Sequence, residues 1–320
     1  MAPPPGPSRS RPGWTASSRQ GGDRVQSLTV GRLTFEWGRR TYVMGILNVT
    51  PDSFSGDGLL HAGGDWIERA VAQARQFFAD GADLVDVGGE STRPGSQPVS
   101  AAEEISRVVP VVERLVSEGL GPISVDSYKA DTVRAALEAG ADMVNDVWAL
   151  RRDPELAAVV AAHKAPIILM HNRSRPEGLI TDPRLGAMYR GTEYNDLIGD
   201  VVAELRQSIA LAHAAGIPDQ HILLDPGIGF GKTVAQNLEL IDRLGELRAL
   251  GYPILVGPSR KGFIGYTLGL PADQRLEGTA ATVAIAIARG ADIVRVHDVA
   301  AMVRVARMSD ALVRRQPAVQ

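Results

Sequence analysis

The chain of 320 residues is longer than a single β-sandwich needs and suits one α/β barrel of about 250 residues with extensions. Its 34 Lys and Arg residues against 37 Asp and Glu residues leave a net charge of −3, which supplies no basic surface for nucleic acid or for an anionic membrane. The absence of cysteine excludes a disulfide framework and a thiolate metal site. We therefore expect a cytoplasmic protein whose partners are neither nucleic acids nor membranes.

The beginning of the chain is rich in Pro, Gly, Ser and Arg and holds no apolar signal-peptide core. It has some features of a transit peptide, but its Pro and Gly residues would break the amphipathic helix that such peptides form. We interpret residues 1–27 as a disordered tail, 28–315 as one domain and 316–320 as a C-terminal tail. The longest apolar run, at 278–288, is far shorter than the roughly 20 residues of a membrane helix.

The domain begins with an alternating segment at 28–40 that turns at Gly31, which predicts a β-hairpin covering the bottom of the fold. Three later segments share the pattern Gly-Ala-Asp-x-Val. In each of them the glycine follows a helical pattern, as at a left-handed helix stop, and a short apolar run follows the glycine, as in a buried strand. These segments are residues 80–90, 139–147 and 289–297.

Short apolar runs alternate with helical patterns along the whole domain, and this alternation predicts a (β/α)8 TIM barrel. An open, doubly wound sheet is the alternative that the pattern leaves open. A long gap after the fifth run predicts an insertion at 171–196. The predicted strands are 42–47, 83–87, 122–125, 142–145, 166–170, 221–225, 253–257 and 292–296, and predicted helices include 66–80, 131–140, 197–216 and 279–290.

Polar side chains occur where each predicted strand ends. A single Asp at a strand end is usually a helix cap, but in a barrel all C-terminal strand ends meet at one mouth. Polar residues at every end therefore predict a functional mouth. The set comprises Asn48, Asp86, Glu90, Asp126, Asn145, Asp146, His171, Asp225, Ser259, Arg260, Lys261, Arg295 and His297.

The segment "DPGIGFGKT" at 225–233 superficially resembles a nucleotide-phosphate loop. Its spacing does not fit, because Pro226 occupies the position of a required glycine. We interpret its glycines as allowing the backbone to bring Asp225 and Phe230 close to a flat ligand.

Two loops, "MGILNVTPDSFSGDG" at 44–58 and "GGESTRPG" at 88–95, resemble the signature loops of the dihydropteroate synthase family of pterin-binding TIM barrels. The resemblance covers about residues 28–315. It implies a transferase of folate biosynthesis that condenses p-aminobenzoate with 6-hydroxymethyl-7,8-dihydropterin diphosphate, giving 7,8-dihydropteroate and diphosphate. It also implies Mg²⁺ as cofactor, a homodimer, and a target of sulfonamides. The other matching segments, in the family's order, are "SVDSYK", "VNDV", "LMH", "LDPGIGFGK", "GPSRKGFIG" and "RVHDV".

At the diphosphate, the resemblance implies that Asn48 holds Mg²⁺ and that Arg295 and His297 bind the same group. Breaking the bond to diphosphate places negative charge on the leaving group and positive charge on the pterin methylene, which cations at one end and carboxylates at the other would stabilise. The neutral aromatic amine requires no strong base, so positioning and electrostatics would dominate. The loop at 48–58 would be a lid that excludes water.

At the pterin, the resemblance implies that Asp225 and Asn145 read the amino-pyrimidinone edge, with Asp126 as a further carboxylate. A carboxylate accepts two parallel N–H donors from such an edge, as it does from guanidinium. Lys261 would reach the pterin carbonyl and ring nitrogen, and Met170 would line the substrate pocket. Asp126, Asp225 and Lys261 are therefore candidate catalytic residues.

At the aminobenzoate, the resemblance implies a pocket lined by Thr92, Pro94, Phe230 and Ser259. Arg93 would cover the reacting centre when the loops close, which makes it the fourth candidate catalytic residue.

Some features differ from the family pattern. The first loop reads "SFSGDG" where many members have Asp-Gly-Gly, and Ile228 replaces a common aromatic residue. Arg173 and Arg175, in the insertion, could contact substrate, but we interpret them as solvated loop charges. The alternatives are a pterin-dependent methyltransferase barrel that acts on a corrinoid partner, and a non-catalytic pterin-binding regulator. The segments "STRPG" and "SRK" favour the synthase over the methyltransferase. The presence of Asn48, Lys261 and Arg295, which a regulator would be expected to lose, favours it over the regulator.

Overall fold

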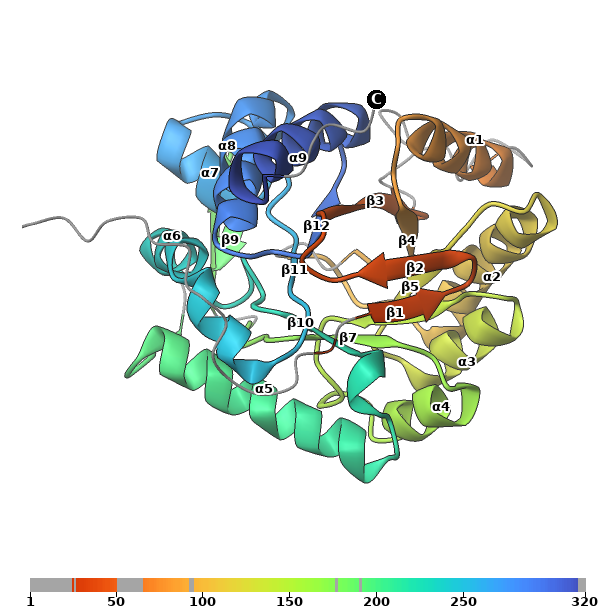
Figure 1. The fold of residues 1–320 in the computed structure, drawn as a ribbon. Coiled ribbons are helices and arrows are strands. Elements are labelled where there is room, and N and C mark those ends of the chain that lie inside the picture. Colours follow the sequence, from red (N-terminus) through yellow and green to blue (C-terminus); the bar gives the residue numbers. More distant parts are fainter. Residues whose placement is uncertain are drawn as a thin grey trace, which may run out of the picture.

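A parallel β-barrel surrounded by helices forms the centre of the molecule (Figure 1). The computed structural model describes residues 25, 27–50, 66–91, 95–175, 178–189 and 192–315. The predicted tails, apart from Val25 and Ser27, lie outside the described residues. So do most of the predicted lid and the residues Thr92, Arg93 and Pro94.

The strands of the barrel are hydrogen-bonded in the order β10, β7, β6, β5, β4, β3, β12 and β11, all parallel. A parallel bridge between Leu224 and Ile254 joins the two edges of this eight-stranded sheet, so the sheet returns on itself. The strands follow one another around the barrel in chain order, which confirms the (β/α)8 prediction over the open sheet. Their bounds are β3 (Tyr42–Asn48), β4 (Leu84–Gly88), β5 (Ile123–Asp126), β6 (Met143–Asp146), β7 (Ile167–Met170), β10 (Ile222–Asp225), β11 (Leu255–Val256) and β12 (Ile293–Val296).

Amphipathic helices cover the outside of the barrel, with their apolar faces against the strands (Figure 1). In the second helix, for example, Val108, Val112 and Leu115 are fully buried. Each predicted helix is present. The helices are α1 (Trp66–Ala79), α2 (Ala101–Ser117), α3 (Ala130–Glu138), α4 (Leu156–His163), α5 (Leu197–Ala214), α6 (Val234–Asp242), α7 (Gly262–Leu268), α8 (Leu276–Ala288) and α9 (Val299–Val313), with short 3₁₀ turns η3 (Asp219–His221), η4 (Leu244–Leu250) and η5 (Ala272–Gln274).

The glycine of each repeated Gly-Ala-Asp segment ends a helix in the left-handed conformation, as predicted. Gly81, Gly140 and Gly290 have φ angles of 97°, 106° and 101°. Residues with a side chain rarely adopt this conformation, so the repeat marks a backbone requirement at the start of a strand.

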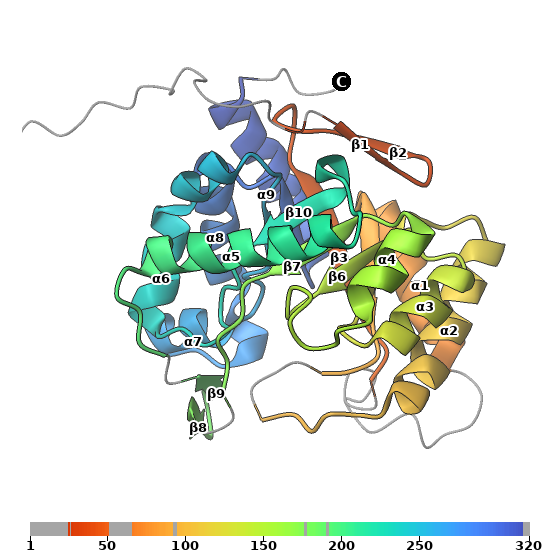
Figure 2. The same cartoon turned by 90° about the horizontal axis from the view of Figure 1, so that it is seen from below.

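The predicted N-terminal hairpin consists of β1 (Ser27–Val30) and β2 (Leu33–Glu36), and it closes the bottom of the barrel (Figure 2). Leu28, Val30 and Phe35 are buried in one cluster with apolar side chains from the barrel strands. The hairpin therefore covers the N-terminal ends of the strands and leaves the mouth open, as predicted.

Inward-facing positions change from apolar to polar along the barrel. Because alternate residues of a strand face the same side, the residue two positions after an inward apolar residue also faces inward. In four strands the second of these is charged or an amide: the pairs are Leu84 and Asp86, Met143 and Asn145, Leu223 and Asp225, and Ile293 and Arg295. In β5 the buried polar residue Ser124 precedes Asp126. Charged and amide groups therefore lie toward the mouth.

The predicted insertion contains a second antiparallel hairpin, β8 (Leu179–Asp182) and β9 (Gly186–Tyr189). It lies at the end of the barrel opposite to β1 and β2 (Figure 2). In the part of the chain that the structure describes, no helix is long and apolar enough to cross a membrane.

Candidate active site

A cavity of about 630 Å³ at the barrel mouth brings together every described residue to which the family resemblance assigns a substrate or metal role. Of the other polar strand-end residues, Glu90 and Arg260 line this cavity, whereas Asp86, Asp146 and His171 do not. The residues with these roles come from six strands and from the loops that follow β10, β11 and β12. Thr92, Arg93 and Pro94 lie outside the described residues. The predicted site residues that line the cavity are Asn48, Asp126, Asn145, Met170, Asp225, Phe230, Ser259, Lys261, Arg295 and His297.

The floor of the cavity is a charge cluster centred on Arg295. Its Nε donates to Asp86 Oδ2 at 2.6 Å, and its Nη2 donates to Asp126 Oδ2 at 2.6 Å. Asn145 Nδ2 donates to the same oxygen of Asp86 at 2.8 Å. Asp86, a strand-end residue to which the sequence assigned no role, therefore positions both Arg295 and Asn145.

Two carboxylate oxygens of this cluster have no hydrogen-bond donor among the described residues. Asp86 Oδ1 and Asp126 Oδ1 are buried and accept no hydrogen bond from any residue that the structure describes. Burial raises the pKa of Asp126 to about 7, although the charge of Arg295 lowers it, and the nearby charge of Asp86 raises it further. A buried acceptor without a donor is costly, so Asp126 Oδ1, on a residue that lines the cavity, suits a ligand that carries N–H groups.

Lys261 connects two sides of the cavity. Its ammonium donates to the carbonyl oxygen of Ile228 and lies 4.6 Å from the centre of the Phe230 ring. Burial lowers the pKa of Lys261 to about 8, and the negative charge of Asp225 opposes that shift. Burial also raises the pKa of Asp225, whose Oδ1 accepts a hydrogen bond from Gly227 N at 2.7 Å.

Ser259 and His297 form the polar wall beside this lysine. Ser259 Oγ accepts a hydrogen bond from His297 N at 3.1 Å and lies 3.0 Å from His297 Nδ1. Asn48, partly exposed at the end of β3, lines the same cavity.

The backbone conformation of the loop between β10 and α6 requires glycine at three positions. Gly227, Gly229 and Gly231 have φ angles of 71°, 84° and 66°. A Cβ at Gly227 would lie 1.8 Å from the carbonyl oxygen of His171, so no larger residue fits there. Asp225 and Phe230 line one cavity, and their closeness to a flat ligand stays a prediction. The close contact that requires a glycine is between Gly227 and the backbone of His171, at the end of the neighbouring strand β7.

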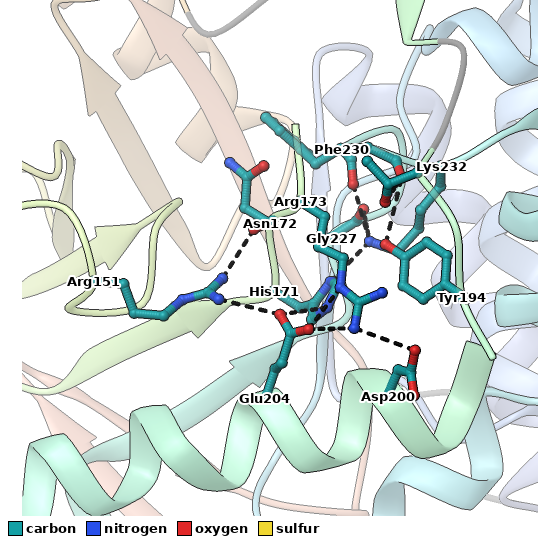
Figure 3. Close-up of polar contacts among 12 residues, drawn as sticks. Arg151, His171, Asn172, Arg173, Tyr194, Asp200, Glu204, Gly227, Phe230 and Lys232 are labelled. Carbon is teal, nitrogen blue, oxygen red and sulfur yellow. Dashed lines mark hydrogen bonds and ion pairs between the residues drawn. The ribbon is translucent and has the colours of Figure 1, made fainter. Parts of the chain in front are cut away.

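A buried lysine holds this loop in place (Figure 3). Lys232 is 1% exposed, and its Nζ donates to the carbonyl oxygens of Gly227 at 2.9 Å and Phe230 at 3.1 Å. Its third contact is His171 Nδ1, at 3.0 Å. Burial lowers the pKa of Lys232 to about 7, and the charge of Asp225 opposes that shift.

Glu204, an acidic residue of α5, contacts the ring nitrogen of His171 that does not face Lys232 (Figure 3). His171 Nε2 lies 3.3 Å from Glu204 Oε2, and Arg173 Nε donates to Glu204 Oε1 at 2.6 Å. Burial lowers the pKa of His171 to about 4, and the charge of Lys232 lowers it further. Burial acts to raise the pKa of Glu204, but hydrogen bonds from His171 and Arg173 bring it down to about 2.

The interpretation of Arg173 as a solvated loop charge is wrong. Besides Glu204, its guanidinium pairs with Asp200 at 3.2 Å and lies over the ring of Tyr194 at 4.3 Å. Arg175 is exposed, as the sequence suggested. The contribution of Glu204 could not be predicted from the sequence, because a single acidic residue in an amphipathic helix is typical of an exposed surface.

No group of three or more His, Cys, Asp or Glu side chains that would hold a metal ion occurs among the described residues. The chain therefore offers isolated oxygen ligands, such as the side chain of Asn48, in the part that the structure describes.

Comparison with known proteins places the chain in a defined group. A family profile described as pterin binding enzyme matches residues 44–297. The dihydropteroate synthase of Synechocystis sp. is 49% identical over 288 residues, which are 90% of this chain and 95% of that protein. The dihydropteroate synthase of Bacillus subtilis is 45% identical over 92% of this chain and 96% of its own length.

Solved structures agree with these relatives. A dihydropteroate synthase from Clostridium difficile, crystallised in the presence of pteroic acid, has a TM-score of 0.79 and 46% identity over 88% of this chain and 99% of its own. The enzyme from Xanthomonas albilineans with 4-aminobenzoic acid has a TM-score of 0.80 and 41% identity over 90% and 98%. That from Yersinia pestis, with a sulfonamide drug complex, has a TM-score of 0.81 and 40% identity over 91% and 100%.

Proposed function

The chain belongs to the dihydropteroate synthase family, and we propose that it carries out that family's reaction through the residues of the barrel mouth. The enzyme is a transferase that joins the amine of p-aminobenzoate to the methylene of 6-hydroxymethyl-7,8-dihydropterin diphosphate. The products are 7,8-dihydropteroate and diphosphate. The corrinoid methyltransferase and the regulator are set aside, because relatives that match almost their whole length to this chain are named synthases.

One observation carries this proposal: buried carboxylates, an amide and a lysine converge on one cavity. Asp126, Asn145 and Asp225 each expose polar atoms to it from neighbouring or facing strands. The amino-pyrimidinone edge of a pterin carries adjacent N–H donors, which would satisfy the buried oxygen of Asp126. Lys261 donates to the pterin carbonyl from the opposite side. Ligands in related structures, pteroic acid and 4-aminobenzoic acid, support this reading.

The reaction separates charge across the mouth. The bond between the methylene carbon and the diphosphate oxygen breaks, its electron pair leaves with diphosphate, and the amine nitrogen bonds to the methylene carbon. The proton of the new ammonium passes to solvent. Arg295 and His297 stabilise the leaving anion, while Asp126 and Asp225 stabilise the cationic pterin. Since Arg295 already binds two carboxylates, it tunes the position of Asp126 as well.

We propose Mg²⁺ as the cofactor, with Asn48 as its ligand from this chain. Mg²⁺ is commonly held by one or two protein oxygens together with substrate phosphates and water, and an isolated amide oxygen at a strand end fits that pattern. When bound, the ion would neutralise charge on the diphosphate. The chain's own residues position both substrates.

The aminobenzoate lies, in this proposal, between Phe230 and Ser259. Phe230 supplies an aromatic face beside Lys261, and Ser259 is held by His297. The roles of Thr92, Arg93 and Pro94, and the lid role of residues 48–58, stay predictions. Sulfonamides that mimic p-aminobenzoate would compete for this pocket.

We also propose a homodimer that forms through α8 and α9. Ile285, Met308 and Leu312 are 48%, 60% and 69% exposed on these helices, although they are large and apolar. Sedimentation would give a dimer mass for the unmodified protein and a monomer mass for Leu312→Glu. A dimer mass for both would contradict this interface. The cytoplasmic location stays a prediction.

The direct test of the function is to mix the protein with the pterin diphosphate, p-aminobenzoate and Mg²⁺. We expect diphosphate release that depends on both substrates, and a product with the mass of dihydropteroate. Diphosphate release without the amine would indicate hydrolysis, and no release at all would overturn the proposal.

A further inference from the structure

The β8–β9 hairpin is a preorganised element. Its strands pair from Leu179 with Tyr189 to Asp182 with Gly186. Asp182 Oδ1 accepts hydrogen bonds from Arg184 N at 2.8 Å and Leu185 N at 2.7 Å, which fixes the turn at its tip. The hairpin therefore has a defined shape of its own.

Its tip is bonded to the loop that carries Lys261. Arg275, 3% exposed, donates from Nη2 to the carbonyl oxygen of Leu185 and from Nη1 to that of Arg260, each at 2.8 Å. The hydroxyl of Tyr266 donates to the carbonyl oxygen of Gly186 at 3.2 Å. One buried guanidinium thus couples the hairpin to the segment before α7.

The hairpin also forms a wall of the substrate cavity. All residues from 183 to 189 line it, together with Phe230, Ser259 and Lys261. The wall stands close to α7, since a Cβ at Gly262 would lie 3.2 Å from Met188 Cβ. At the hairpin's base, Leu179 Cδ2 would lie 3.2 Å from a Cβ at Gly95.

We propose that the β8–β9 hairpin limits the length of the aromatic amine substrate. This rests on the proposed function: the amine of p-aminobenzoate faces the pterin, so its carboxyl group points away, toward Phe230, Ser259 and the hairpin wall. The wall accommodates a free carboxylate and obstructs an amine whose carboxyl group is extended through an amide. A fixed wall of this kind discriminates by about 10- to 200-fold.

The test uses p-aminobenzoate and p-aminobenzoylglutamate as matched short and long amines. In one variant Asn-Gly replaces residues 180–188, because Leu179 and Tyr189 are already paired and a two-residue turn can join them. We expect kcat/KM for the long amine, relative to the short one, to rise about tenfold or more. The KM for the pterin diphosphate should stay within about twofold. An unchanged ratio between the two amines would overturn the proposal.

A point variant covers the case in which the shortened protein does not fold. Met188→Ala removes most of a side chain that lines the cavity, and it should shift the ratio in the same direction. Leu211→Ala, on the exposed face of α5 and away from the cavity, is the matched control and should leave the ratio unchanged. A ratio that Met188→Ala does not move, or an unmodified protein that uses both amines equally, would overturn the inference. No diphosphate release from the unmodified protein with either amine would overturn the proposed function itself.

Discussion

Lys232 Nζ and His171 Nδ1 lie 3.0 Å apart at the barrel mouth, and both side chains are buried. Because His171 follows β7 and Lys232 follows the glycine loop after β10, the contact ties two neighbouring strand ends together. The lysine also holds the carbonyl oxygens of Gly227 and Phe230. We therefore expect the position of the Phe230 ring to depend on Lys232, a residue to which the proposed reaction assigns no direct role.

Lys232→Met should loosen this loop. It leaves carbonyl oxygens without their donor, at a cost of about 1–3 kcal/mol in the free energy of unfolding. We expect KM for p-aminobenzoate to rise roughly tenfold, with a smaller change for the pterin diphosphate, because the loop carries Phe230. Steady-state kinetics and urea unfolding measure these quantities.

The control for Lys232→Met is Asp310→Asn at the bottom of the barrel. Asp310 accepts hydrogen bonds from Thr41 N at 2.6 Å and Thr41 Oγ1 at 2.8 Å, so its loss also destabilises the fold. It should leave both KM values unchanged. Equal changes in both KM values for Lys232→Met would mean that the lysine has only a structural role.

His171 should make the protein less stable in mild acid. Its pKa is about 4 in the folded protein against 6.5 in the free side chain, because burial and Lys232 disfavour its charged form. Below pH 6.5 the unfolded chain therefore takes up a proton that the folded protein does not. The free energy of unfolding should fall by about 3 kcal/mol between pH 6.5 and 4 from this group.

Comparison with His171→Gln isolates this effect. Burial raises the pKa of Asp126, whose proton uptake stabilises the folded protein in acid and so acts in the opposite direction. The lowered pKa of Glu204 adds a further loss of stability below pH 4.5. Urea unfolding at pH 7 and pH 5 should show a smaller loss for His171→Gln than for the unmodified protein. Parallel pH profiles would contradict the prediction.

Asp225→Ala should remove most of the affinity for the pterin. Asp225 is buried, and hydrogen bonds from ligand N–H groups to a buried carboxylate are strong. We expect a loss of about 3 kcal/mol, or a factor of ~100, in calorimetric titration with a pterin. Near-normal turnover would contradict the edge-reading role.

Asn48→Ala tests the magnesium proposal. Removing an amide oxygen ligand should raise the Mg²⁺ concentration for half-maximal activity roughly tenfold or more, at saturating substrates. The readout is a metal titration of diphosphate release, with direct Mg²⁺ binding in the presence of diphosphate as the second measurement. An unchanged titration would mean that other residues hold the ion.

The sequence predicted those parts of the site that depend on strand period and barrel closure. Asp126 and Asp225 were placed at the mouth because they end apolar runs, and a barrel brings all such ends together. The hydrogen-bond partners of these residues could not be predicted in this way, because they depend on how distant parts of the chain pack together. Arg295 bonds to Asp86 across 209 positions in the sequence. Nothing in the composition of the insertion showed that Arg275 would fasten its hairpin to the active-site loop.

Deprotonation of Lys261 should lower the activity at alkaline pH. Burial lowers its pKa to about 8 while Asp225 opposes the shift, so the ammonium is present below that pH and lost above it. kcat/KM for the pterin diphosphate should then fall about tenfold per pH unit above 8. In Lys261→Arg the guanidinium stays charged, so activity is lower but the alkaline limb disappears. If the limb persists there, the titrating group is a different one, and Lys232, with a pKa of about 7, is the nearest candidate.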